Sequence, residues 1–124
     1  MIDVEVDNRS GVEVDEAGAV ELIRRVLGAE GVDAGELGLV FVGPDESRAL
    51  KREHLGVDEA TDALAFPLDG LDELPEGLPR QLGDVVVCPQ VVGGAWREPV
   101  VHAVLHLLGY DHGAEMEARE ALHA

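Results

Sequence analysis

Three of the five histidines lie within residues 102–112, and their spacing suits a metal ion. His102 and His106 are four residues apart, so a helix would present both side chains on one face. Gly109 can end that helix, and His112 follows closely enough to fold back toward the pair. Three neutral imidazoles with a fourth position open to water form the catalytic type of zinc site. We therefore predict one zinc ion per chain, although the same ligands also suit nickel, copper or iron.

A simpler interpretation is that two histidines at this spacing are ordinary surface residues. The residues around them argue against it, because apolar side chains occupy nearly every side of the expected helix and predict that it is buried. Burying two imidazoles without partners for their ring nitrogens would cost on the order of a few kcal/mol, and a metal would supply those partners. The apolar residues are Val100, Val101, Val104, Leu105, Leu107 and Leu108.

The rest of the chain reads as strands and helices that alternate along the sequence. Period-two or unbroken apolar runs predict strands at 2–6, 37–42, 63–66 and 85–88, the last of them central in the sheet. Helical periodicity and capping residues predict helices at 15–28, 45–54, 99–109 and 114–122, and the breaker-rich stretch 68–82 predicts an exposed loop. We expect an α+β fold, a small mixed sheet of about four strands packed with helices, with the three-histidine site at the end of a buried helix.

Composition limits the classes of protein that remain. The 124 residues suit one domain, over residues 1–124, and 9 basic against 26 acidic residues give a net charge of −17. Long-range attraction to DNA or to an anionic membrane is therefore unfavourable, and RNA would need a local site. The single cysteine, Cys88, excludes an internal disulfide. No apolar run reaches the roughly 18 to 20 residues of a membrane span, and no signal peptide is recognisable, so we expect a cytoplasmic protein.

Three segments resemble the YbeY family of bacterial rRNA maturation factors. Residues 102–112 read H-A-V-L-H-L-L-G-Y-D-H, against the family pattern H-G-x-L-H-L-x-G-Y-D-H, and differ from it only at Ala103. Residues 61–67 are similar to the family's T-D-V-L-S-F-P, and residues 83–88 are similar to its G-D-I-V-I strand. The order of the three segments also agrees, so the resemblance covers about residues 1–122.

The resemblance implies a zinc-dependent, single-strand-specific endoribonuclease that acts in rRNA maturation and ribosome quality control. The family's three zinc ligands carry over to His102, His106 and His112. The expected chemistry is attack of metal-activated water on a phosphodiester. No glutamate follows His102, so the H-E-x-x-H arrangement of metalloproteases is absent. Asp111 could accept a hydrogen bond from a ligand imidazole, or it could simply cap the end of a helix.

The sequence departs from the family at a position where an arginine is thought to serve catalysis. The family segment L-N-x-x-Y-R corresponds to residues 50–55, which place Leu55 where the arginine is expected. Arg52 lies three residues earlier and is our candidate catalytic replacement. Loss of such a donor would slow phosphodiester cleavage by about 10²- to 10³-fold, by analogy with oxyanion donors.

Two other functions remain open on the sequence alone. One is a zinc-stabilised binding protein of ribosome assembly with little catalytic activity, because an acidic chain suits a basic ribosomal protein. The other is a metal hydrolase that acts on a small phosphoester. The discriminating feature is whether Arg52, Arg80 or Arg97 points toward the metal.

Trp96 could stack on a base, but packing near the start of the buried helix is the favoured interpretation.

Overall fold

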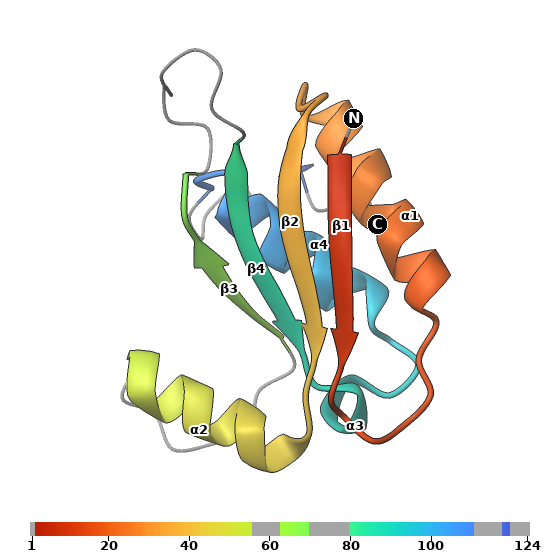
Figure 1. The fold of residues 1–124 in the computed structure, drawn as a ribbon, viewed down its shortest axis with the longest axis vertical. Helices are drawn as coiled ribbons and strands as arrows, with labels where there is room; N and C mark the ends of the chain where they lie inside the picture. The colour runs from red at the N-terminus through yellow and green to blue at the C-terminus, as the bar shows by residue number, and fades with distance from the viewer. Residues whose placement is uncertain (1, 56–62, 70–79, 111–117, 120–124) are drawn as a thin grey trace.

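The computed structural model describes residues 2–55, 63–69, 80–110 and 118–119 (Figure 1). Strands and helices alternate over the first half of the chain, as the sequence predicted, and in the second half two successive strands precede two successive helices. In order they are β1 (Ile2–Asn8), α1 (Glu16–Ala29), β2 (Gly35–Phe41), α2 (Pro44–Leu55), β3 (Ala63–Pro67), β4 (Gln81–Val87), α3 (Pro89–Val92) and α4 (Arg97–Leu107).

The four strands form one mixed sheet in the order β1-β2-β4-β3. β1, β2 and β4 are parallel, whereas β3 runs antiparallel to β4 at the edge. The predicted mixed sheet and the interior position of the 85–88 segment are therefore confirmed. Val85, Val86 and Val87 are all buried, as expected for a strand with neighbours on both sides.

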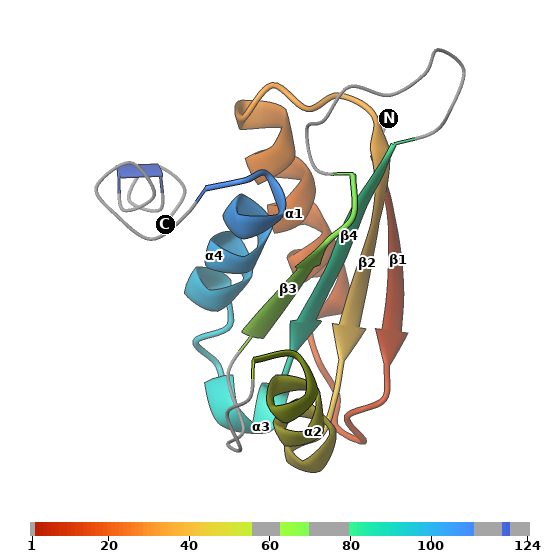
Figure 2. The same ribbon diagram turned by 90° about the vertical axis from the view of Figure 1, so that its left-hand side faces the viewer.

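Helices α1 and α4 cover one face of the sheet (Figure 2). The buried side of α1 carries apolar residues three, four, seven and eight positions apart, which is the pattern that faces a core. α4 is buried along most of its length. The residues of α1 concerned are Ala19, Leu22, Ile23, Val26 and Leu27. Those of α4 are Val100, Val101, Ala103, Val104, Leu105 and Leu107.

On the opposite face of the sheet, no helix of the described residues lies over β1 and β2 (Figure 2), and we call this the open face. Four carboxylates point outward there: Asp3 and Glu5 from β1, Glu36 from β2 and Asp84 from β4, all exposed. Asp3 and Glu36 are register partners on neighbouring strands, so two like charges face each other. Nearer β3 the same face becomes apolar, where Val86 belongs to a small cluster with residues 42 and 64.

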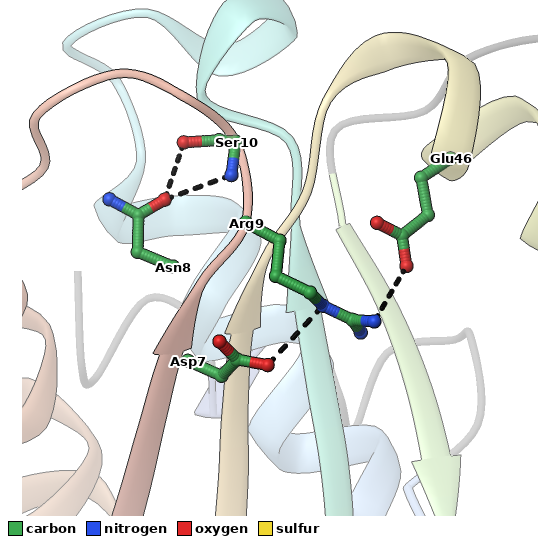
Figure 3. A network of polar contacts seen from close by, with 5 residues as sticks. All are labelled: Asp7, Asn8, Arg9, Ser10 and Glu46. Atoms are coloured by element: carbon green, nitrogen blue, oxygen red, sulfur yellow. Dashed lines mark hydrogen bonds and ion pairs between the residues drawn. The ribbon is translucent and has the colours of Figure 1, made fainter.

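The loop after β1 is joined to the first turn of α2 by a charged residue. The Arg9 guanidinium lies 3.3 Å from an Asp7 carboxylate oxygen and 3.2 Å from a Glu46 carboxylate oxygen (Figure 3). Beside it, the Asn8 side-chain oxygen accepts hydrogen bonds from the backbone N–H and the hydroxyl of Ser10. The Arg9 N–H also donates to the carbonyl oxygen of Phe41 at 2.7 Å. The carboxyl ends of β1 and β2 and the start of α2 are thus held together.

Two predicted boundaries around β4 were wrong. The strand begins at Gln81 rather than at 85, so the end of the predicted 68–82 loop is strand. The reason is non-local backbone pairing: Gln81 pairs with Glu36, and the Asp69 N–H donates to the Gln81 carbonyl oxygen at 2.8 Å. Cys88 is not the last strand residue but the N-cap of α3, a short helix that the sequence pattern did not predict.

The helix that carries the histidines begins two residues earlier than predicted. α4 starts at Arg97, so Pro99 is its third residue instead of its first, and it still lies in the turn where a helix needs no backbone N–H. Of the predicted helix 114–122, residues 118 and 119 are helical and the others lie outside the described residues. Within the described parts of the chain, no helix is long and apolar enough to cross a membrane.

Candidate metal centre

α4 carries the two histidines and ends just after the second of them. The Gly109 N–H donates to the His106 carbonyl oxygen at 3.0 Å, and the Tyr110 N–H donates to the Leu105 carbonyl oxygen at 3.1 Å. These two bonds form a Schellman motif, which requires a left-handed residue after the cap. Gly109 supplies it with a φ of 98°. The predicted helix stop is therefore confirmed, and the chain leaves the helix axis directly after the turn that contains His106.

His102 and His106 approach each other closely. Their Nε2 atoms lie 3.0 Å apart, their ring centroids lie 4.7 Å apart, and the ring planes meet at 71°. Both residues are half-buried, whereas the residues between them, Ala103, Val104 and Leu105, are buried. The four-residue spacing thus brings both rings to the same side of the helix, as the sequence predicted.

The pair meets the chemical requirements of a divalent metal. Two nitrogens bonded to one zinc ion at about 2.0–2.1 Å lie roughly 3.3 Å apart at a tetrahedral angle, which is close to the observed separation. Neutral imidazole is a common ligand of zinc and of several first-row transition metals. Without a metal, the same contact is a hydrogen bond between the two rings, whose donor and acceptor depend on the tautomers.

The other half of the predicted site lies outside the described residues. This applies to His112, the third predicted ligand, and to Asp111, a predicted catalytic residue. In the parts of the chain that the structure describes, no three His, Cys, Asp or Glu side chains form a metal-binding group. The three-ligand site therefore stays a prediction.

The three candidate cations lie on different elements. Arg52 is an exposed residue of α2, a helix that begins where β2 leaves the sheet. Arg97 belongs to the first turn of α4, and its guanidinium carbon lies 5.1 Å from the centre of the Trp96 ring. Arg80 is half-buried and precedes β4, the strand whose first residues face the last turn of α4. The catalytic role of Arg52 stays a prediction.

A carboxylate that the sequence analysis did not single out lies next to the end of this helix. Glu30 caps the C-terminus of α1, and its side chain is only 4% exposed. The Tyr110 hydroxyl donates a hydrogen bond to Glu30 Oε1 at 2.8 Å, and Arg119 Nη1 lies 3.6 Å from Glu30 Oε2. No local pattern could have indicated this cluster, because Tyr110 is 80 residues from Glu30 in the chain.

The contact with Glu30 changes the acidity of the tyrosine. The hydrogen bond that Tyr110 donates to Glu30 raises the pKa of the phenol above its ordinary value of 10.0. Burial and the negative charge of Glu30 raise this pKa further, and Arg119 opposes the effect. Tyr110 is thus a neutral donor at physiological pH.

A cavity of about 370 Å³ lies at the other end of α4, where β2 and β4 end. Phe41, Val87 and Val92 line it together with Trp96, and Glu13 stands beside them. Trp96 is half-buried and packs against the main core, as the favoured interpretation predicted. Neither described histidine lines this cavity, so it is separate from the candidate metal centre.

Comparison with known proteins connects the chain to one family. A sequence model of that family, described as "Endoribonuclease YbeY", matches residues 5–124. A protein of that name from Mycobacterium ulcerans is 34% identical over 134 residues, covering 94% of this chain and 75% of the relative. Another, from Halorhodospira halophila, is 44% identical over 104 residues, covering 70% of this chain and 65% of the relative.

A solved structure agrees with the fold. The solution structure of a Thermotoga maritima protein aligns with 99% of this chain and 86% of its own, with a TM-score of 0.58 and 24% sequence identity. At this level of identity the likeness concerns the fold alone.

Proposed function

The chain belongs to the YbeY endoribonuclease family, and from this membership we propose that it is a zinc-dependent, single-strand-specific endoribonuclease. Its proposed task is rRNA maturation and ribosome quality control in the cytoplasm. The observation that carries the proposal is the 3.0 Å approach of the His102 and His106 Nε2 atoms within the family's own motif. Half-buried imidazoles that converge in this way are expected where a metal ion is bound.

We propose that His102, His106 and His112 hold the zinc ion. When bound, zinc supplies a Lewis acid that activates water and polarises a phosphodiester. The chain's own contribution is to position the ligands, because α4 brings the two imidazole rings together. The sides of α4 that are buried in the core exclude water from the rear of this pair. The turn at Gly109 brings the chain out of the helix immediately before Asp111 and His112. In this proposal Asp111 accepts the second ring N–H of a ligand imidazole and fixes its orientation.

RNA binding must be local in so acidic a protein. With a net charge of −17, the field around the molecule repels a phosphate backbone, so a cation is needed at the site. We propose Arg52 for this role, since its side chain is exposed on α2. Single-stranded RNA suits such a site better than a duplex, because a flexible strand can present one phosphate at a time.

The proposal is tested by cleavage of a labelled single-stranded rRNA fragment. Zinc-loaded wild type and the His106→Ala variant are purified side by side, so that a contaminating nuclease would appear in both. We expect cleavage by wild type alone, with zinc bound one to one. Equal cleavage by both proteins, or none by a zinc-loaded wild type, would overturn the nuclease proposal.

The open face favours a second candidate function, which is binding of a basic ribosomal protein during ribosome assembly. Asp3 and Glu36 face each other there, and none of the helices that the structure describes covers them, so a cationic partner would relieve their repulsion. Under this alternative the zinc ion stabilises the fold and RNA cleavage is negligible. Pull-down of ribosomal proteins by wild type but not by an Asp3→Asn, Glu36→Gln variant, together with inactivity toward RNA, would support it.

A further inference from the structure

The cavity at the start of α4 lies at the edge of the sheet where ligands are usually bound. Phe41 and Val87, the last residues of the parallel strands β2 and β4, both line it. In open sheets built of parallel strands, the carboxyl ends of the strands are the common position of a ligand. The volume of about 370 Å³ falls within the range of small-molecule sites and is far larger than one water molecule needs.

Hydrogen bonds between separate parts of the chain hold the walls of this cavity together. The Gln90 side-chain N–H donates to the Ser10 carbonyl oxygen at 3.0 Å, which ties α3 to the loop after β1. Asp15 lines the cavity and also caps α1, where its side chain accepts a hydrogen bond from the Gly18 N–H at 3.0 Å. The cavity is thus formed without a ligand, which reduces the entropy that binding would cost.

The lining combines apolar walls with negative charge. Phe41, Val92 and Trp96 are among the apolar side chains, and the charged ones are Glu13 and Asp15, both exposed. Among the residues that the structure describes, no lysine or arginine lines the cavity. A cation with an apolar body satisfies both kinds of surface, whereas an anion is repelled. The net charge of −17 acts in the same direction.

The indole of Trp96 is the wall best suited to a cation. Among aromatic side chains, tryptophan attracts cations most strongly. The Arg97 guanidinium carbon lies 5.1 Å from the centre of this ring, so the indole contacts a cation in the structure itself. Arg97 is exposed and is not a lining residue, whereas Trp96 is half-buried and lines the cavity. A ligand in the cavity therefore meets a part of Trp96 that Arg97 does not occupy.

We propose that this cavity binds a small organic ammonium ion. Its apolar body lies against Phe41 and Trp96, and its charged group lies beside Glu13 and Asp15. The ligand joins the start of α1 to the start of α4, because Asp15 is the N-cap of the first helix and Trp96 is the N-cap of the second. The site does not depend on the proposed function, since neither described histidine lines the cavity.

The first test is titration of the whole chain with phenethylamine, which is an ammonium ion at neutral pH. Trp96 is the only tryptophan, so its fluorescence reports on this cavity. We expect saturable binding with a dissociation constant on the order of 1 mM, as for a ligand of this size. Phenylethanol has the same ring without the charge and should bind about 5-fold more weakly, and phenylacetate should not bind. Equal affinities for the three probes, or no binding of phenethylamine, would overturn the proposal.

Two variants test the role of the carboxylates. Glu13→Gln should weaken the binding of phenethylamine about 3-fold and leave that of phenylethanol unchanged. Asp15→Asn keeps an oxygen that can cap α1, and it should weaken the binding of phenethylamine further when combined with Glu13→Gln. Glu16→Gln is the matched control, because it removes the same charge from an exposed residue outside the lining. Equal effects of Glu13→Gln and Glu16→Gln would overturn the proposal, since the probe would then respond only to net charge.

A variant that fills the cavity tests where the probe binds. Val92→Phe enlarges a half-buried side chain of the lining and should abolish the binding of phenethylamine. Val91→Phe is the control, because Val91 is an exposed residue of the same helix outside the lining. Thermal unfolding verifies that both variants are folded, and the Glu13→Gln comparison decides the question if Val92→Phe is not. Wild-type affinity in a folded Val92→Phe would overturn the proposal.

The midpoint of thermal unfolding gives a readout that does not use fluorescence. At ten times its dissociation constant, phenethylamine should raise the Tm of the metal-free protein by about 5 °C. His106→Ala should show the same increase, so the result does not depend on the metal centre or on nuclease activity. An unchanged Tm in both proteins would overturn the proposal, and an increase confined to wild type would show that the probe binds at the histidines instead.

Discussion

Leu107 of α4 packs directly against Gly83 of β4, with no space for a side chain at position 83. A Cβ atom there would lie 2.9 Å from Leu107 Cδ2 and would overlap the carbonyl oxygen of Phe66 on β3. Gly83 also has a φ of 134°, a conformation that other residues rarely adopt. Because Leu107 directly follows His106, this contact seats the last turn of the histidine-bearing helix on the sheet.

Gly83→Ala should therefore destabilise the protein by roughly 2 to 4 kcal/mol, since backbone strain and overlap with a carbonyl oxygen add together. Urea unfolding of the metal-free protein measures the loss. Gly28→Ala is the control, because the structure leaves open space around a Cβ at that helical position. It should stabilise the protein by up to about 1 kcal/mol. Equal stabilities of the two variants would contradict the close packing at position 83.

Zinc should stabilise the folded protein through the histidine pair. A ligand that binds only the folded state at 100 times its dissociation constant adds about 2.7 kcal/mol, which raises the Tm of a domain this size by roughly 10 °C. Scanning calorimetry with zinc and with a chelator measures the shift. His106→Ala should lose it, because one of the two converging nitrogens is gone. The same shift in that variant would place the zinc elsewhere.

The sequence predicted the parts of this fold that depend on local periodicity. Alternation at Ile2, Val4 and Val6 marks one strand, and the spacing of Val20, Ile23 and Leu27 marks one helix face, because burial repeats with the period of each element. The first residues of β4 could not be predicted in this way. Gln81 joins the strand through pairing with Glu36 of β2, a contact between distant parts of the chain.

The same distinction holds for the candidate site. The proximity of His102 and His106 follows from their spacing on one helix, so the sequence alone was sufficient. Glu30 meets Tyr110 only because α1 and α4 pack side by side over the sheet (Figure 2). A carboxylate at the end of an amphipathic helix is too common to indicate such a contact, and only the three-dimensional arrangement reveals it.

Tyr110 should ionise above its ordinary pKa of 10.0, because the neutral phenol donates to Glu30. It is the only tyrosine in the chain, so the ultraviolet absorbance of tyrosinate in the metal-free protein reports it alone. Glu30→Gln should move the pKa back toward the ordinary value. An unchanged titration in that variant would mean that the hydrogen bond to Glu30 is not the main cause of the shift.

The raised pKa also predicts how the stability depends on pH. A phenol whose pKa is higher in the folded than in the unfolded state stabilises the fold fully below the unfolded value of 10.0, and this contribution is lost as pH rises through the folded value. The free energy of unfolding of wild type minus that of Tyr110→Phe should thus be constant at neutral pH and should shrink in alkali. A difference that grows with pH would contradict this sign.

Leu55→Arg should accelerate RNA cleavage, because it restores a cation at the position where the YbeY pattern has arginine. A donor to the developing phosphorane charge contributes about 10²- to 10³-fold to the rate of cleavage.

If Arg52 now fills this role, Arg52→Ala should strongly reduce the rate of RNA cleavage, and adding Leu55→Arg to that variant should restore it. Arg48→Ala, one turn earlier on the same exposed side of α2, controls for the general loss of positive charge. Equal reductions of the cleavage rate in Arg52→Ala and Arg48→Ala would show that Arg52 acts only through net charge. If Leu55→Arg leaves the cleavage rate unchanged, another residue of this chain makes the phosphate contact.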